Sequence, residues 1–323
     1  MVTGGTGFVG SHLIDRLLAS GHDVTALVRS PARAAGLEGR GVTLVRGDLH
    51  DEAAIRAAVR GQNVVYHAAA LVAAKDEADF FRANREGTAN VVRAMEQLAP
   101  YARLVHVSSL AAAGPAALGI PRTTEHAEAP VTMYGRSKNA AEQVVRESHL
   151  PWVIARPPAV YGPRDRDNFL QVFKLVRSGF APVFGDGTQE LSMVYAPDLA
   201  RALELVGTTP GIESRAYFTN HPEVVTTADL VRRIGRLMGR DVRVIPIPQA
   251  AAKALLGAAG QVAALLGNRT ILRAEKAHDF FSPGWTGDPT QLMSDTGWLP
   301  EHDLDRGLAA TKRWYQESGW LSR

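Results

Sequence analysis

Short apolar runs alternate with longer amphipathic stretches over residues 1–160 of the chain. The short runs are rich in β-branched residues, and this predicts strands at Val24–Val28, Val42–Val45, Val64–Tyr66, Leu104–Val107 and Val153–Ala155. The longer stretches carry apolar residues at helical spacing, and this predicts helices at Val9–Leu18, Glu52–Val59, Phe80–Leu98 and Tyr134–Glu147. Apolar strands that alternate with helices are typical of a parallel sheet covered on both faces. The pattern therefore predicts an α/β, doubly wound fold.

A glycine-rich turn precedes the first predicted helix, in the segment TGGTGFVG. Gly4 permits the tight turn, Gly7 lets the backbone approach a pyrophosphate, and Gly10 lets the helix pack close to the sheet. The helix N-terminus then faces the negative charge. A glycine triplet alone is a weak signal, but this one opens a helix in a βαβ unit of the right length, so it predicts a Rossmann-type dinucleotide site. Only Met1–Thr3 precede the turn, so the central strand is expected to be very short unless the native chain starts upstream.

The ends of the second and third strands bear on the choice of cofactor. Arg29 stands where an acidic residue would bind a free ribose 2′-hydroxyl, and an arginine there suits a 2′-phosphate. Arg33 is placed to assist it. Asp48, in the sequence RGDL, follows the third strand, where a carboxylate meets the adenine amino group. NADP(H) is therefore the preferred cofactor and NAD(H) the alternative, unless Arg29 and Asp48 are ordinary surface and turn residues.

Composition excludes several classes of function. The chain has 323 residues, 46% hydrophobic and 21% charged, with a formal net charge of +3. It has no basic block, so we expect no nucleic-acid partner. It has no cysteines, and its ten histidines never fall in a metal-ligand spacing, so we expect no metal. The apolar segment 249–266 is too short and interrupted for a membrane span, and predicts a helix that is buried or covers a pocket. We expect a soluble, cytoplasmic protein.

The segment TMYGRSK places Tyr134 and Lys138 four residues apart, on one face of a predicted helix. Such a pair is either an idle surface pair or a tyrosine held beside a cation so that its proton can move. The spacing alone favours the first interpretation, because both residue types are common. The rest of the chain has to decide.

Seven motifs in order resemble the extended short-chain dehydrogenase/reductase family, which contains the NAD-dependent epimerases and dehydratases. The likeness covers nearly the full length, and its character is that of the 3β-hydroxysteroid dehydrogenase and dihydroflavonol reductase branches. The motifs are TGGTGFVG (3–10), GDL (47–49), VVYHAAA (64–70), NREGTANVV (84–92), VHVSSLAAAG (105–114), YGRSK (134–138) and RPPAVYGPRD (156–165). The resemblance implies that the Tyr134–Lys138 pair is catalytic.

By that resemblance, Tyr134 is the general acid/base and Lys138 supplies the cation that lowers the tyrosine's pKa and holds the ribose hydroxyls. Ser109 aligns with the catalytic serine, with Ser108 as second choice. Asn84 matches an asparagine that supports a proton-relay water, and a helix-cap or packing role is almost as well supported. His67 is expected to serve packing. The implied cofactor contacts are Gly4, Thr6, Gly7, Phe8, Val9, Gly10, Arg29, Asp48, Leu49, Ala68, Ala69, Tyr134, Lys138, Pro157 and Val160.

The family pattern also implies two lobes. The dinucleotide-binding domain is expected at 1–160 with returning segments near 191–220, where Met193–Tyr195 and Tyr217–Thr219 rejoin the sheet. A smaller, mostly helical substrate lobe is expected at 161–323. The substrate would lie between the lobes at the carboxyl ends of the strands. A homodimer through the helices near 80–98 and 134–148 is expected by analogy.

Three functions compete because a fold does not fix a substrate. They are an NADP-dependent reductase or dehydrogenase of a hydrophobic ketone or alcohol, a nucleotide-sugar epimerase or dehydratase, and a catalytically idle dinucleotide sensor. The complete Ser–Tyr–Lys set argues against the sensor. Dehydratases of the family carry an Asp–Glu pair after the catalytic hydroxyl, and here Leu110 and Ala111 follow Ser109.

Whether the substrate is a nucleotide sugar depends on residues 191 and 192. Nucleotide-sugar members of the family have an Arg–Asp pair there, and the arginine binds the diphosphate. This chain has Leu191 and Ser192. Three other arginines are candidates to replace the missing one: Arg164, Arg166 and Arg273. The segment Leu110–Leu118 is small and apolar, which favours a hydrophobic ligand over a sugar.

Overall fold

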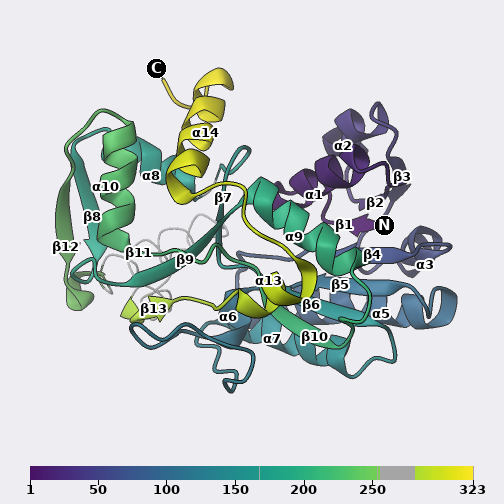
Figure 1. Ribbon diagram of the computed structural model, residues 1–323. Coiled ribbons are helices and arrows are strands. Elements are labelled where there is room, and N and C mark those ends of the chain that lie inside the picture. Colours follow the sequence, from purple (N-terminus) through teal and green to yellow (C-terminus); the bar gives the residue numbers. More distant parts are fainter. Residues whose placement is uncertain (167, 253, 255–280, 323) are drawn as a thin grey trace.

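The computed structural model describes residues 1–166, 168–252, 254 and 281–322 (Figure 1). Most of the apolar segment 249–266, together with Arg273, lies outside the described residues, as does the side chain of Arg33. Among the described residues, no helix combines the length and the apolar character that a membrane span requires.

A seven-stranded parallel sheet forms the larger lobe, with strand order β10-β6-β5-β4-β1-β2-β3. Its strands are β1 (Val2–Thr3), β2 (Thr25–Val28), β3 (Thr43–Arg46), β4 (Val64–His67), β5 (Arg103–Val107), β6 (Trp152–Arg156) and β10 (Arg215–Phe218). The predicted α/β fold is confirmed, and each of the five predicted strands lies within a residue or two of its expected place. The central strand β1 has only two residues, as expected from the short segment before the glycine turn.

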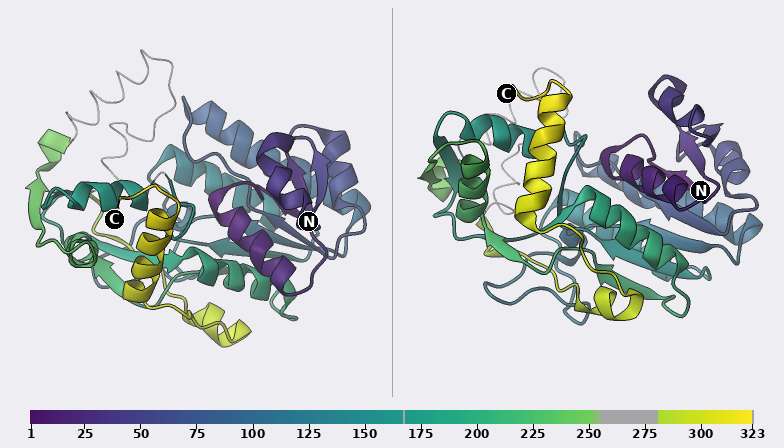
Figure 2. Two further views of the ribbon diagram at one scale, coloured as in Figure 1. Left: turned by 90° about the horizontal axis from the view of Figure 1, so that it is seen from above. Right: turned by 45° about the horizontal axis from the view of Figure 1, so that its top comes forward.

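Helices cover both faces of this sheet. The first face carries α1 (Phe8–Ala19), α2 (Pro31–Glu38), α9 (Ala196–Thr208) and α13 (Thr290–Thr296). The second face carries α3 (Glu52–Val59), α5 (Gly87–Leu98) and α7 (Met133–Arg146). Figure 2 shows α1 and α9 side by side, where they make the most extensive helix–helix contact of the described chain.

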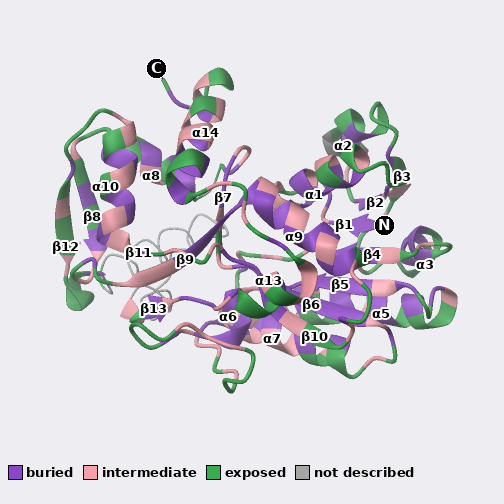
Figure 3. Cartoon of the chain, viewed as in Figure 1, coloured by how far each residue is buried: buried purple, intermediate pink, exposed green. Residues whose placement is uncertain are grey.

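The strands are buried on both sides because their alternate residues enter two separate cores. Val105 and Val107 of β5 pack under α1 and α9, whereas Leu104 packs under α3, α5 and α7. A strand has a side-chain period of two, so one apolar strand supplies both cores. Figure 3 shows the buried strands between the two helical layers.

The smaller lobe combines helices with two short sheets. Its helices are α8 (Phe169–Val176), α10 (Thr227–Leu237) and α14 (Leu304–Glu317). One sheet joins β7 (Ala159–Tyr161), β9 (Glu190–Tyr195), β11 (Val224–Thr226) and β13 (Gly284–Trp285), and the other pairs β8 (Phe180–Phe184) with β12 (Arg243–Ile247). A third apolar core lies between these helices and strands.

One expectation about the returning segments is wrong. Met193–Tyr195 belongs to β9, which pairs with β7, β11 and β13 and not with the large sheet. The place beside β6 is taken by β10, which contains Tyr217 and does return to the large sheet. The chain leaves that sheet after β6 at Pro157 and Pro158, where proline nitrogens cannot donate to a continuing ladder.

The helix predicted at Phe80–Leu98 contains a local change of winding. Its parts are α4 (Glu77–Phe80), a π-helical segment η1 (Phe81–Glu86) and then α5. π-helical turns are rare within α-helices, and those that do occur are often found at functional sites. Asn84, one of the predicted site residues, lies in this turn.

Candidate active site

The glycine turn has the geometry that a dinucleotide requires. Gly4 has φ of +71°, and its carbonyl accepts a 2.9 Å bond from the amide of Gly7. A Cβ at Gly10 would lie 2.2 Å from the Gly4 carbonyl oxygen, so a side chain there would push the helix away from the turn. Thr6 and Gly7 are exposed, and α1 begins at Phe8 and Val9 without a side-chain cap. Its first amides are therefore free to bind an anion, and the residues fit a pyrophosphate.

Tyr134, Ser109 and Lys138 meet at the carboxyl edge of the large sheet. Tyr134 and Lys138 are one turn apart on α7, whose first turn is capped by Thr132 accepting from the Gly135 amide at 3.0 Å. Ser109 follows β5, caps the short helix α6 (Leu110–Ala113), and is hydrogen-bonded to the Tyr134 hydroxyl. The structure thus brings Ser109 into contact with Tyr134 and places Lys138 one helical turn away.

The electrostatics of Tyr134 differ from the expectation. Burial raises the pKa of Tyr134, and the hydrogen bond with Ser109 offsets only part of this effect. Lys138 was expected to lower the pKa, but its ammonium is directed elsewhere: it donates to the Val107 carbonyl at 2.9 Å and lies 3.5 Å from Nε2 of His106. In this arrangement Tyr134 remains protonated at neutral pH.

Lys138 is itself perturbed, because it is only 1% exposed. Burial lowers its pKa to about 8, although the nearby charge of Glu142 acts in the opposite direction. The two buried imidazoles of His67 and His106 lie with ring centroids 5.5 Å apart on the strands beneath it. Burial, and then the charge of Lys138, lower the pKa of both, His67 to about 3 and His106 well below its usual value.

His67 holds the sheet edge, in agreement with the expected packing role. Its Nδ1 lies 2.8 Å from the Thr3 hydroxyl, and its Nε2 lies 3.0 Å from the Thr88 hydroxyl. The Thr88 hydroxyl donates its own proton to the Asn84 carbonyl at 2.6 Å. It must therefore accept a hydrogen bond from His67, which places the ring proton of His67 on Nε2. Both ring nitrogens are satisfied, and His67 has no capacity left for chemistry.

Asn84 is fully engaged with protein groups. Its side-chain oxygen accepts from the Leu71 amide at 2.7 Å, and its amide nitrogen donates to the Leu71 carbonyl at 3.0 Å and the Ser137 hydroxyl at 2.9 Å. These bonds tie the π-helical turn to α7 and to the loop after β4. The packing alternative for Asn84 thus has direct structural support.

The adenosine end of the predicted cofactor site is open. Arg29 is exposed and has no ion-pair partner among the described residues. Asp48 is exposed and accepts a 2.7 Å bond from the His50 amide within its own turn. Leu49 is anchored by its carbonyl, which accepts from Asn90 at 2.8 Å.

Three of the remaining predicted cofactor contacts follow the carboxyl ends of strands of the large sheet. Ala68 and Ala69 come directly after β4, and the Ala69 amide donates to Thr3 at 3.1 Å. Pro157 follows β6, and its carbonyl accepts from the Leu110 amide at 2.8 Å. Val160 lies in β7 and packs against the first core. Ala68, Ala69 and Pro157 therefore lie at the edge where open α/β sheets bind ligands, whereas Val160 belongs to the sheet of the smaller lobe.

A buried charge cluster behind the site was not predicted. Glu142, on α7, accepts from Ser108 at 2.5 Å and from Arg156 at 2.6 and 2.9 Å. Arg156 also pairs with Glu128, which in turn pairs with Arg146 at 2.7 Å. Glu142 lies at i+8 from Tyr134, on the same helical face, and this spacing was the signal in the sequence that could have identified it.

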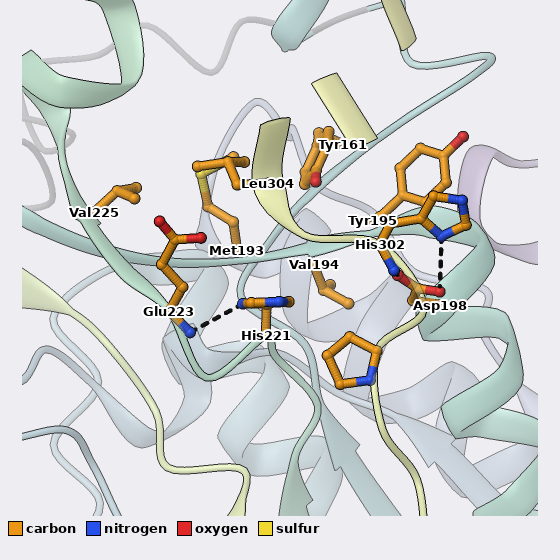
Figure 4. A pocket seen from close by; sticks show the side chains of 11 residues that line it. Tyr161, Met193, Val194, Tyr195, Asp198, His221, Glu223, Val225, His302 and Leu304 are labelled. Carbon is orange, nitrogen blue, oxygen red and sulfur yellow. Dashed lines mark hydrogen bonds and ion pairs between the residues drawn. The ribbon is translucent and has the colours of Figure 1, made fainter. Parts of the chain in front are cut away.

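A small pocket beside β9 is lined by none of the predicted site residues (Figure 4). In it, His302 lies 3.3 Å from Asp198, and His221 accepts from the Glu223 amide at 3.0 Å. Asp198 also accepts from the backbone amides of Glu301 and His302, so it anchors the chain leading to α14. Among the described residues, no group of three or more His, Cys, Asp or Glu side chains is arranged to hold a metal ion.

Comparison with known proteins identifies the family. The model of the NAD dependent epimerase/dehydratase family matches residues 1–217, the part of the chain that contains the glycine turn and the Ser–Tyr–Lys group. The chain belongs to this family. It is an NAD(P)-dependent enzyme of the extended short-chain dehydrogenase/reductase type.

Reductases and a protein solved in complex with a UDP-sugar are among the proteins to which the chain is similar. The chain is 28% identical to the ceramide reductase of Caulobacter vibrioides, over all of this chain and 96% of that one. It is 32% identical to the 2-alkyl-3-oxoalkanoate reductase of Shewanella oneidensis, over 72% of this chain and 64% of that one. Among solved structures, MoeE5 in complex with UDP-glucuronic acid and NAD matches with a TM-score of 0.78 and 25% identity, over 98% of each chain. These relatives support an oxidoreductase and leave its substrate open.

Proposed function

We propose that the protein is an NADP-dependent reductase that converts a hydrophobic ketone or aldehyde to the alcohol. The observation that carries the proposal is the hydrogen bond between Ser109 and Tyr134, with Lys138 one turn along α7, in a chain that has Leu191 in place of the arginine expected for a sugar diphosphate. The names of the two reductase relatives, which act on ceramide and on a 2-alkyl-3-oxoalkanoate, agree with an apolar carbonyl substrate.

In the proposed reaction the cofactor and three side chains have separate roles. The cofactor, when bound, supplies the hydride. Ser109 donates a hydrogen bond to the substrate oxygen, and Tyr134 gives that oxygen its proton. Because the pKa of Tyr134 is raised by burial, the hydroxyl stays protonated at neutral pH, which suits a proton donor and hence the reductive direction. In the family pattern Lys138 holds the ribose hydroxyls, and its positive charge, one turn along α7 from Tyr134, favours the phenolate as the proton leaves.

The case against a nucleotide sugar rests on three side chains. Leu191 packs against the apolar core of the smaller lobe, so it offers a diphosphate no donor. Arg164 pairs with Asp15 on α1 at 2.6 Å. Arg166 lies over the Trp320 ring at 4.4 Å. The two candidate substitutes among the described residues, Arg164 and Arg166, are therefore already engaged.

The preference for NADP(H) is proposed from Arg29. Its guanidinium is exposed at the end of β2 and free to bind a 2′-phosphate. No acidic residue is present at that strand end to favour a free 2′-hydroxyl.

A substrate panel tests the proposal. Purified protein with NADPH should reduce at least one hydrophobic ketone or aldehyde, followed by the loss of NADPH absorbance. Calorimetry on the NADPH complex should show no binding of UDP-glucose. Micromolar binding of UDP-glucose, with no ketone turned over, would instead support the second candidate, a nucleotide-sugar epimerase, which the complex of MoeE5 with UDP-glucuronic acid and NAD favours.

A further inference from the structure

Lys138 lies in surroundings that oppose its charge. It is buried on α7, with His106 of β5 at 3.5 Å and His67 of β4 behind that ring. Both imidazoles are neutral, and the Val107 carbonyl is the other close polar group. Tyr134, one turn earlier on α7, is an uncharged phenol. Among the described residues, the anion that acts on Lys138 is Glu142.

Glu142 lies one turn beyond Lys138 on α7 and is completely buried. Its two oxygens receive four hydrogen bonds. One oxygen accepts from Ser108 at 2.5 Å and from Nε of Arg156 at 2.9 Å, and the other accepts from Arg156 at 2.6 Å and Arg146 at 3.1 Å. All of these partners are donors, which is the arrangement that an ionised carboxylate accepts.

The donors come from the elements that carry the candidate site. Ser108 is the neighbour of Ser109 at the end of β5. Arg156 is the last residue of β6 and precedes Pro157. Glu142 itself belongs to the helix of Tyr134 and Lys138. One carboxylate therefore joins the three segments whose relative positions define the site.

We propose that Glu142 is a positioning residue of this enzyme, which keeps Lys138 charged inside the protein and fixes the end of β5 that carries Ser109. The inference rests on the proposed function, since it assigns the charge of Lys138 a use in proton transfer by Tyr134. Glu142 acts through Lys138 and Ser108 and does not touch the reacting atoms.

Substitution Glu142→Gln tests the electrostatic part with a direct readout. The titration of Lys138 is followed by NMR on the full chain with labelled lysine, and the Lys138 resonance is assigned by its loss in Lys138→Met. We expect the titration midpoint of Lys138 to fall by about one pH unit in Glu142→Gln. The ammonium form exists below the midpoint, so the alkaline limit of ketone reduction should move to lower pH by the same amount. An unchanged midpoint overturns the proposal.

A matched control separates the charge of Glu142 from the stability of the cluster. Glu128→Gln removes a carboxylate that also pairs with Arg156 and Arg146 but belongs to the loop before α7. It should leave the Lys138 midpoint and the alkaline limit unchanged, and an equal fall in this variant overturns the specific role of Glu142.

A second variant protects the test against misfolding. Should Glu142→Gln fail to fold, the double variant Glu142→Met with Arg156→Met replaces the pair by apolar side chains of similar volume, a change that folded proteins often tolerate. It should show the same fall, and an unchanged midpoint overturns the proposal here as well. If the wild-type protein reduces no ketone or aldehyde, the proposed function fails while the NMR titration still measures the effect of Glu142.

Discussion

The two ends of the predicted cofactor crevice are built differently. At the nicotinamide end, Lys138 and the cluster around Glu142 are buried and hydrogen-bonded to three elements of the fold. At the adenosine end, Arg29 is exposed and unpaired among the described residues, and Asp48 bonds only within its own turn.

The difference reflects what each end has to do. Proton transfer requires atoms held at hydrogen-bond distance, and a buried, satisfied network provides this at a cost in desolvation. Discrimination between two cofactors needs only a difference in affinity, and in the proposed function one exposed cation, Arg29, supplies that difference without an ordered network. Changes at the first end should therefore affect chemistry and stability, and changes at the second should affect only cofactor affinity.

The largest effect is expected at the buried end. Tyr134→Phe should lower the turnover of any identified ketone by about 10²–10⁴-fold, the usual share of general acid/base catalysis, with cofactor affinity nearly unchanged. Steady-state kinetics and cofactor fluorescence measure the two quantities. Tyr101→Phe, at a 95% exposed tyrosine, is the control and should change neither. Turnover near the wild-type value in Tyr134→Phe would remove Tyr134 from the mechanism.

The next effect is expected at the open end. Arg29→Ala should weaken NADPH binding by roughly tenfold to a hundredfold, which corresponds to the loss of a charge-assisted contact of about 1.5–3 kcal/mol. NADH affinity and the melting temperature should not change. Fluorescence titration with both reduced cofactors measures this, with Arg60→Ala, an exposed arginine at the end of α3, as control. Equal losses for NADPH and NADH would show that Arg29 does not read the 2′-phosphate.

A third prediction concerns stability at the rim of the buried cluster. Burial alone would raise the pKa of Glu128, but its bonds with Arg146, Arg156 and Asn139 hold that pKa at about 2. A carboxyl whose pKa is lowered on folding contributes stability above its ordinary pKa of 4.5 and loses it as the pH falls towards 2. Glu128→Gln should therefore cost about 2 kcal/mol at pH 7.

Urea unfolding at pH 7 and at pH 3 checks this sign. The difference between wild type and Glu128→Gln should shrink at the lower pH. Glu147→Gln, at an exposed glutamate that ends α7, should be neutral at both pH values. A difference that grows on acidification would contradict the assignment.

The smallest effect is expected at Asp48. Asp48→Asn keeps an oxygen that accepts from the His50 amide, so the turn should persist. Cofactor affinity should fall only a few-fold, because an exposed side chain competes with water for the adenine amino group. Calorimetry with NADPH measures it, and a loss as large as that of Arg29→Ala would mean that the two ends are less different than their exposure indicates.

The sequence by itself determined the parts of this protein that depend on local periodicity. Strand and helix positions, the glycine turn and the Tyr134–Lys138 spacing are each encoded within a few turns of chain, and the structure has them where they were predicted. The sequence could not determine which sheet β9 would join, because strand pairing depends on which sheet edges other segments leave free. Here β10 occupies the place beside β6, and β9 belongs to the smaller sheet.

Tertiary structure alone decided the electrostatics of the site. The pKa of Tyr134 was expected to fall beside Lys138, and it is raised, because burial outweighs the bond with Ser109 and the ammonium turns towards Val107 and His106. The surroundings of Glu142 were also decided by the tertiary structure, because its partner Arg156 lies on another element and only packing removes both side chains from water. A charge's environment is a sum over every element packed around it, and no local pattern of residues contains that sum.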